Sequence, residues 1–126
     1  MEFALVLPFL LAVVFGILEY GWIFYQQFNL AGAVRDGLRQ GVTVSQDATP
    51  DPKAFAKQRA QADLQAIGIA PASVTLTASY NVPSPQTNPP TTTMTLKADM
   101  TYHKLIGFVP TPAKLTYSMT MMLELQ

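Results

Sequence analysis

The sequence predicts an α+β fold, in which a long N-terminal helix packs by its C-terminal half on a small domain of one helix and roughly three antiparallel strands. Three observations predict it. Residues 3–25 form an apolar run with Glu19 as its single charge. Residues 26–44 change to an amphipathic helical pattern, and residues 74–125 contain three stretches that alternate apolar and polar side chains.

The apolar run at residues 3–25 has the length of a membrane-spanning helix. As a helix it rises roughly 34 Å, and a bilayer's hydrocarbon core is about 30 Å thick. A signal peptide is the first alternative, but no Lys or Arg precedes Arg35, and Glu19 and Trp22 lie where a cleavage site is expected. A plain membrane anchor is the second alternative, and it stays open.

The helix is expected to continue from about residue 2 to about residue 44, with a possible bend at Pro8 because proline removes one backbone hydrogen bond. One face has apolar residues every fourth position: Leu30, Val34, Leu38 and Val42. A second row has small residues at the same spacing: Ala33, Gly37 and Gly41. Such a row lets another helix approach closely, or it simply weakens the helix end.

A shorter helix follows the polar segment at residues 45–52. Asp51 and Pro52 have the residue types of an N-cap and a first helical position. The expected apolar face consists of Ala56, Ala60, Leu64 and Ile67. Gly68 is expected to cap the C-terminus, and Pro71 prevents the helix from continuing.

Strands are expected to begin near Val74, Thr92 and Lys114, because apolar and polar residues alternate strictly from each of these positions. The sheet should bury one face against the second half of the long helix. A proline-rich loop at residues 83–91 joins the first two strands. The connection at residues 103–112 carries three large apolar residues expected to cover the sheet edge: Leu105, Ile106 and Phe108. The chain thus divides into three parts: residues 1–25, residues 26–45 and a globular domain at residues 46–126.

Composition argues against several functions. The 126 residues carry no net charge and no cysteine, with a pI of about 6.5. No basic patch favours nucleic acid, and neither a disulfide framework nor a thiolate metal site is possible. His103 is the single histidine, and no residues have the spacing of a catalytic, phosphate-binding or metal site. We therefore expect a protein that is not an enzyme and uses no cofactor or metal.

The N-terminal 41 residues resemble the N-terminal region of TadE-like pilins and pseudopilins of the tight-adherence (type IVc) pilus system. The matching residues are Glu2-Phe3-Ala4-Leu5, Pro8, Gly16, Glu19, Gly21 and Val34-Arg35-Asp36-Gly37. The specificity of this match rests on Glu2, Pro8 and Glu19 together. The resemblance implies a pilin-like fold and assigns subunit assembly to Glu2, Phe3, Pro8, Gly16, Glu19 and Gly21.

The resemblance also implies a mechanism. A prepilin peptidase removes a short basic leader, and the pilus assembly machinery draws subunits from the bacterial inner membrane into a helical homo-oligomeric filament for adhesion. Glu2 matches the glutamate that pairs with the terminal amine of a neighbouring subunit. A buried anion needs such a counter-charge. The first rival function is a single-span membrane-anchored binding protein that does not polymerise, and the second is an enzyme or transport subunit.

The start of the chain departs from the family pattern, because only Met1 precedes Glu2 and no leader is visible. We expect either a processed chain or a start at an internal or engineered methionine. Arg35 and Arg39 alone would place the domain in the cytoplasm. The resemblance instead places it outside the cytoplasm.

Glu19 is expected to find a hydrogen-bond donor on an adjacent subunit once helices pack into a filament core. The candidate donors are Tyr20, Trp22, Tyr25, Gln26 and Gln27 of neighbouring chains. The alternative is a Glu19 that faces solvent in a groove.

Overall fold

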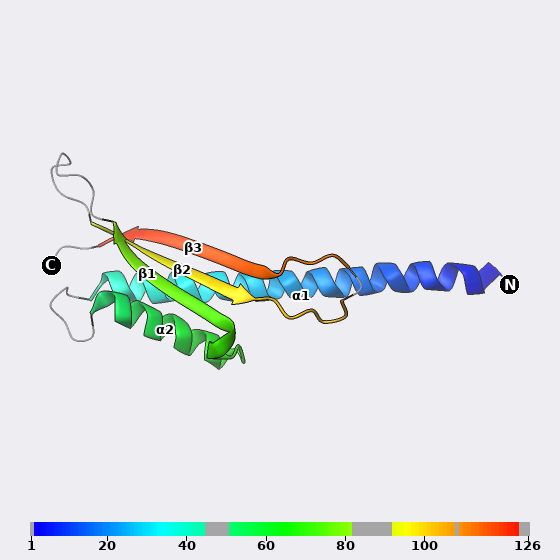
Figure 1. The fold of residues 1–126 in the computed structure, drawn as a ribbon, viewed down its shortest axis with the longest axis horizontal. Coiled ribbons are helices and arrows are strands. Elements are labelled where there is room, and N and C mark those ends of the chain that lie inside the picture. The colour runs from blue at the N-terminus through cyan, green and yellow to red at the C-terminus, as the bar shows by residue number, and fades with distance from the viewer. Residues whose placement is uncertain (1, 45–50, 82–91, 108, 124–126) are drawn as a thin grey trace.

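The computed structural model describes residues 2–44, 51–81, 92–107 and 109–123. Its elements are α1 (Glu2–Val42), α2 (Pro52–Ala66), the 3-10 turn η1 (Pro71–Ser73), β1 (Val74–Asn81), β2 (Thr93–Thr101) and β3 (Lys114–Met122). Figure 1 shows that the sheet and α2 lie along the C-terminal half of α1, while its N-terminal half projects beyond them. The predicted α+β fold is confirmed.

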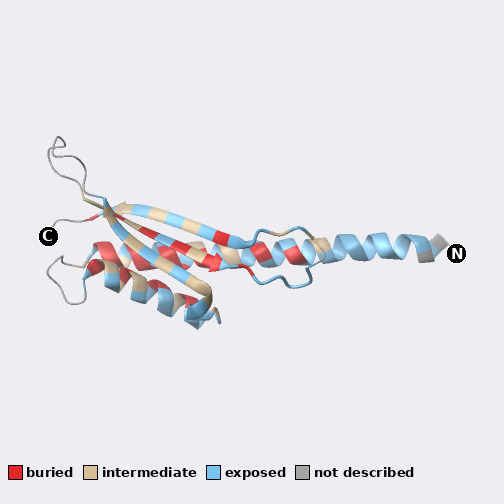
Figure 2. Cartoon of the chain, viewed as in Figure 1, coloured by how far each residue is buried: buried red, intermediate tan, exposed pale blue. Residues whose placement is uncertain are grey.

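α1 is one continuous helix of 41 residues that passes through Pro8 without a break. Its surroundings divide it into two segments (Figure 2). We call residues 3–18 the exposed segment, because all of its described residues are exposed except Gly16, which is half-buried. We call residues 19–42 the packed segment, because it carries all of the buried positions of α1.

The three strands form an antiparallel meander in the order β1-β2-β3. Leu76 lies opposite Ala98, and Leu96 lies opposite Met119, so apolar positions share one face. Exposed and less exposed residues alternate along β1 and β3, as the period of two predicts. The predicted strand starts at Val74 and Lys114 are confirmed, and β2 begins one residue after Thr92.

The core lies between the sheet and the packed segment of α1. Leu30, Val34 and Leu38 are fully buried, and Met94 and Leu96 of the central strand are fully buried as well. The apolar stripe predicted at four-residue spacing is therefore the face that α1 turns to the domain. The proline-rich loop predicted at residues 83–91 lies outside the described residues.

The row of small residues on α1 is the contact with α2. A Cβ on Gly37 would lie 2.7 Å from the Ala56 carbonyl oxygen, and a Cβ on Gly41 would lie 2.6 Å from the Ala56 Cβ. Glycine is required at both positions because the two helices approach this closely. The predicted close approach of another helix is confirmed, and that helix is α2 of the same chain.

α2 begins as predicted, with Asp51 at the N-cap and Pro52 at the first helical position. Its predicted apolar face holds at the three residues within the helix: Ala56, Ala60 and Leu64 are buried. The prediction that Ile67 is the fourth residue of this face is wrong, because α2 ends at Ala66 and Ile67 is 43% exposed. Gly68 follows with φ +83°, a left-handed conformation that turns the chain away from the helix axis.

Candidate functional site

The residues assigned to subunit assembly all lie on α1 but in different surroundings. Phe3 and Pro8 lie in the exposed segment and Gly21 is exposed, whereas Gly16 is half-buried. Glu2 begins α1, and its side chain lies outside what the structure describes. The pairing of Glu2 with a neighbouring amine therefore stays a prediction.

Glu19 is the exception, since its side chain is fully buried. Oε1 accepts hydrogen bonds from the Tyr102 hydroxyl at 2.5 Å and from the Leu105 backbone N–H at 3.0 Å. Oε2 accepts from the Ile106 N–H at 2.8 Å and from the Gly107 N–H at 3.4 Å. We call these five residues the Glu19 site. Four donors thus surround one carboxylate, which is the condition for burying a charge without a counter-ion.

The β2–β3 loop, residues 102–113, supplies all four donors. Figure 1 shows it running along α1 beyond the end of the sheet towards the N-terminus. Tyr102 follows β2 directly, and its N–H donates to the Ala113 carbonyl at 3.1 Å, which closes the base of the loop. Gly107 has φ +77°, a conformation that favours glycine, and this allows consecutive N–H groups to converge on Glu19.

The loop also touches the end of the exposed segment. A Cβ on Gly16 would lie 4.0 Å from Val109 Cγ2, which is ordinary van der Waals contact. The loop therefore contacts α1 over about one turn, from Gly16 to Glu19. The predicted boundary of the apolar segment at residue 25 stays a prediction, although the domain begins to contact α1 well before that residue.

The Tyr102 hydroxyl is protonated at neutral pH and donates its proton to the hydrogen bond with Glu19. Burial, this hydrogen bond and the negative charge of the Glu19 carboxylate together raise the pKa of the phenol from 10.0 to about 12. Its proton lies between the phenol and the carboxylate, so the pair acts as a neutral donor and a charged acceptor.

Two predictions about this region are wrong. The donors to Glu19 come from its own chain, so neither the neighbouring subunit nor a solvent groove is needed. Leu105 and Ile106 do not cover the sheet edge, because the loop runs along α1 and leaves them 55% and 43% exposed. Phe108, the third residue of that prediction, lies outside the described residues.

Sequence reasoning missed Tyr102 and the loop as partners of Glu19, yet one signal pointed to a packed Glu19. Glu19 and the buried Ile23 are four residues apart, and they continue towards the N-terminus the helix face that buries Leu30, Val34 and Leu38. The buried face of α1 thus extends one turn beyond Ile23 towards the N-terminus, to the charged residue Glu19. Its partner was not visible, because Tyr102 lies 83 residues away in sequence.

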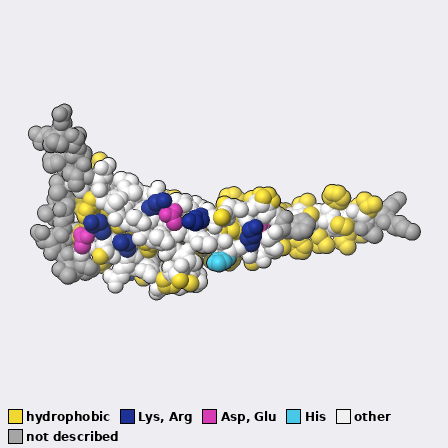
Figure 3. Space-filling view, in the orientation of Figure 1, with side chains coloured by type: hydrophobic (Ala, Val, Ile, Leu, Met, Phe, Trp, Pro, Cys, Tyr) yellow, Lys and Arg dark blue, Asp and Glu magenta, His cyan; other side chains and the backbone are white. Residues whose placement is uncertain are grey.

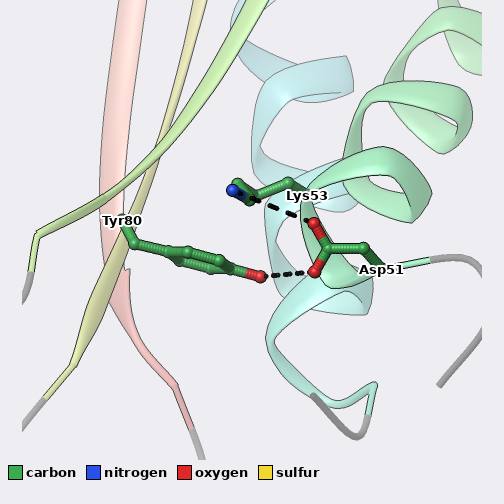
Figure 4. A network of polar contacts seen from close by, with 3 residues as sticks. All are labelled: Asp51, Lys53 and Tyr80. Carbon is green, nitrogen blue, oxygen red and sulfur yellow. Dashed lines mark hydrogen bonds and ion pairs between the residues drawn. The ribbon is translucent and has the colours of Figure 1, made fainter. Parts of the chain in front are cut away.

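A second polar contact joins α2 to the sheet at the other end of the domain (Figure 4). The Tyr80 hydroxyl donates to Asp51 Oδ1 at 3.0 Å, and Lys53 Nζ lies 3.9 Å from Asp51 Oδ2 and 4.3 Å from the centre of the Tyr80 ring. Burial and Asp51 raise the pKa of Tyr80 to about 12. These residues fix the start of α2 against β1, and nothing in their arrangement provides a nucleophile or an acid–base pair.

The remaining chemistry-bearing residues are dispersed. His103 is exposed. Across residues 2–44, 51–81, 92–107 and 109–123, no group of three His, Cys, Asp or Glu residues is placed to hold a metal ion. Within the same residues, α1 is the one helix long and apolar enough to cross a membrane.

The fold and the site define a class of protein. In this class, the N-terminal half of a long helix is apolar and exposed, and its C-terminal half carries a small α+β domain. Residues 1–39 match the family model described as TadE-like protein. The resemblance stated from the sequence is therefore confirmed for the N-terminal helix, the part of the chain that this family model covers. The chain matches none of the curated proteins and none of the solved structures with which it was compared.

Proposed function

We propose that this protein is a structural subunit of the Tad pilus system, either a pilin or a minor pseudopilin. α1 holds it in the inner membrane before assembly and then packs against the same helix of other subunits in an extracellular filament. One observation carries the proposal: the TadE-like match spans residues 1–39, which contain the whole exposed segment.

The exposed segment needs an apolar environment that its own domain does not provide. Phe3 is 89% exposed, Phe9 is 74% exposed and Ile17 is 67% exposed. Burying one such side chain is worth about 1.5–3 kcal/mol. Figure 3 shows that apolar side chains gather along this part of the visible face, whereas the charged side chains lie over the domain. Lipid chains and neighbouring α1 helices both meet this requirement, which is what a subunit that moves from membrane to filament needs.

Two of the predicted assembly residues now have different roles in the proposal. A Cβ on Gly21 would meet nothing within 4 Å, so a helix of another subunit can approach closely there. Gly16 instead lies beside Val109 of the β2–β3 loop in its own chain. Phe3 and Pro8 remain candidate contacts between subunits, and Glu2 remains the candidate partner of a neighbouring amine.

The proposal includes no enzymatic activity, no cofactor and no nucleic acid. Its partners are copies of this chain, a prepilin peptidase, the pilus assembly machinery and the inner membrane. The domain lies outside the cytoplasm, and surface attachment is the expected use of the filament. The competing proposal, a single-span anchored protein that binds a partner without polymerising, shares the membrane stage and lacks the filament.

The test compares Glu2→Gln with Asp36→Asn, an exposed acid on the same helix. Filaments sheared from cells are quantified by immunoblot and electron microscopy, and the membrane fraction is measured in parallel. We expect Glu2→Gln to leave the membrane level unchanged and to reduce filaments strongly, and Asp36→Asn to change neither. A wild-type yield of filaments from Glu2→Gln would refute the pairing of Glu2 with the terminal amine of a neighbouring subunit. Absence of the unaltered chain from sheared filaments would favour the non-polymerising anchor.

A further inference from the structure

The β2–β3 loop lies at the point where α1 changes from exposed to packed. Val109 lies against Gly16, and the backbone of residues 105–107 lies against Glu19. Along the helix axis, the loop is therefore the part of the domain nearest to the exposed segment (Figure 1).

The exposed segment is shorter than a bilayer is thick. Between Glu2 and Glu19, the uncharged residues 3–18 rise roughly 24 Å as a helix. The hydrocarbon core is about 30 Å thick. When the helix spans a membrane with Glu2 at one boundary, the opposite boundary lies about one turn beyond Glu19. The part of the β2–β3 loop beside Glu19 then lies at the acyl-chain boundary, just beneath the lipid headgroups.

The side chains of the loop suit that level. Leu105 and Ile106 are adjacent, and more than two fifths of each is exposed. Lys104 precedes them and is exposed. A pair of apolar side chains next to a lysine can place the apolar groups among acyl chains and the ammonium among phosphates.

The backbone of the loop suits it as well. Irregular backbone is excluded from apolar surroundings because its N–H groups lack partners there. In this loop the N–H groups of Leu105, Ile106 and Gly107 all donate to the Glu19 carboxylate. Residues 105–107 of the loop can therefore contact an apolar phase without leaving these three N–H donors unpaired.

Aromatic residues follow Glu19 on α1, about one and two turns beyond the loop contact. Trp22 and Tyr25 stack with ring centres 5.6 Å apart, and both line one hollow together with His103 at the start of the loop. Trp and Tyr favour the boundary between lipid and water. The rings thus lie at the boundary set by the length of the helix, with the loop just beneath it on the acyl-chain side.

We propose that the β2–β3 loop is a membrane-interface anchor of the unassembled subunit. Leu105 and Ile106 insert at the acyl-chain boundary of a phospholipid bilayer, Lys104 stays with the phosphates, and Glu19 accepts the hydrogen bonds that make the insertion possible. The loop thereby sets how deeply α1 is embedded. This inference rests on the membrane stage of the proposed function.

The test uses the full chain reconstituted in phosphatidylcholine–phosphatidylglycerol vesicles at low protein density. The sequence has no cysteine, so single cysteines carry an environment-sensitive fluorophore at three positions: Ile106→Cys in the loop, Phe9→Cys in the exposed segment and Ser118→Cys on the exposed face of β3. Ile106→Cys removes only a side chain, and the N–H that donates to Glu19 remains. Lipids brominated at different depths of the acyl chain quench the label according to its depth.

We expect the label at 106 to be quenched most by lipids brominated near the headgroup. The label at 9 should be quenched most by deep bromines, and the label at 118 should not be quenched. Deep quenching at 9 with an unquenched, water-exposed label at 106 overturns the anchor and leaves the membrane stage intact. A label at 106 that is shielded from water but not quenched by lipid overturns it in favour of a second copy. An unquenched label at 9 refutes the membrane stage and the anchor with it.

Discussion

The exposed and packed segments of α1 have similar apolar residues and opposite surroundings. Leu10 is 57% exposed and Leu11 is 42% exposed, whereas Leu30 and Leu38 are fully buried. The packed segment confines its apolar residues to one face and places Gly37 and Gly41 where α2 approaches. The exposed segment is apolar on all sides. Hydrophobicity alone therefore shows that a helix requires burial, and the angular pattern around it shows whether its own chain provides that burial.

The comparison predicts that the same kind of substitution has different effects in the two segments. Leu38→Asp should lower the free energy of unfolding of the domain by about 3–5 kcal/mol, because it buries an unpaired charge between α1 and the sheet. Denaturant unfolding of the detergent-solubilised chain, followed by near-ultraviolet circular dichroism, measures this loss.

Leu10→Asp is the matched control in the exposed segment. It should change the unfolding free energy of the domain by no more than about 0.5 kcal/mol. Its effect should instead fall on membrane retention, since a central Asp costs a membrane helix about 2.5–3.5 kcal/mol. Equal unfolding midpoints for Leu38→Asp and Leu10→Asp would show that the sheet does not pack on α1 as described.

Two glycines of the packed segment sharpen the comparison further. Gly37→Ala places a Cβ 2.7 Å from the Ala56 carbonyl oxygen and should destabilise the domain by about 1–3 kcal/mol. At Gly32 the same change meets nothing within 4 Å, and it should stabilise the helix by about 0.5–1 kcal/mol. Thermal unfolding of both variants measures the difference, and a stabilising Gly37→Ala would contradict the close approach of α2.

An effect smaller than that of Leu38→Asp is expected at alkaline pH. Tyr102 has its pKa raised from 10.0 to about 12 in the folded protein, so between these values the unfolded state loses the proton first. Its contribution to stability is complete below pH 10 and is lost as the pH rises through about 12.

Tyr102→Phe removes this contribution together with one hydrogen bond to Glu19, a loss on the order of 1 kcal/mol at neutral pH. The variant should therefore lose less stability than the unaltered protein as the pH rises above 10.0. Tyr80→Phe is the control at the opposite end of the domain, because the pKa of Tyr80 is also raised to about 12. Equal slopes of stability against pH above 10.0 for Tyr102→Phe and the unaltered protein would show that Tyr102 is not buried against Glu19.

Most of the fold was predictable because its elements carry local periodic signals. The stripe from Leu30 to Val42, the alternation from Val74 and the Asp51–Pro52 start of α2 each depend on neighbouring residues. Ile67 was assigned wrongly because helical spacing alone does not show that the helix ends one residue earlier. The glycine row indicated a close approach but not the identity of the second helix.

The candidate site was less predictable, because it depends on a distant contact. A carboxylate in an apolar helix indicates that a partner exists, but the sequence near Glu19 offers only residues of its own helix. The partners are a phenol and three backbone N–H groups of the β2–β3 loop. Backbone donors are available in every sequence, so no residue type identifies them, and only the path of the loop brings them to Glu19.

The sequence distance between Glu19 and Tyr102 has a consequence for biosynthesis. Chains are made from the N-terminus, so Glu19 is synthesised 83 residues before the hydroxyl that it binds. Until β2 and its following loop emerge, Glu19 lacks the four donors that it has in the folded protein. A chain that stops short of the loop keeps that defect, whereas a finished chain removes it by folding. Folding of the N-terminal helix at Glu19 thus depends on synthesis of the chain as far as Gly107, and a product truncated before the loop lacks these hydrogen bonds.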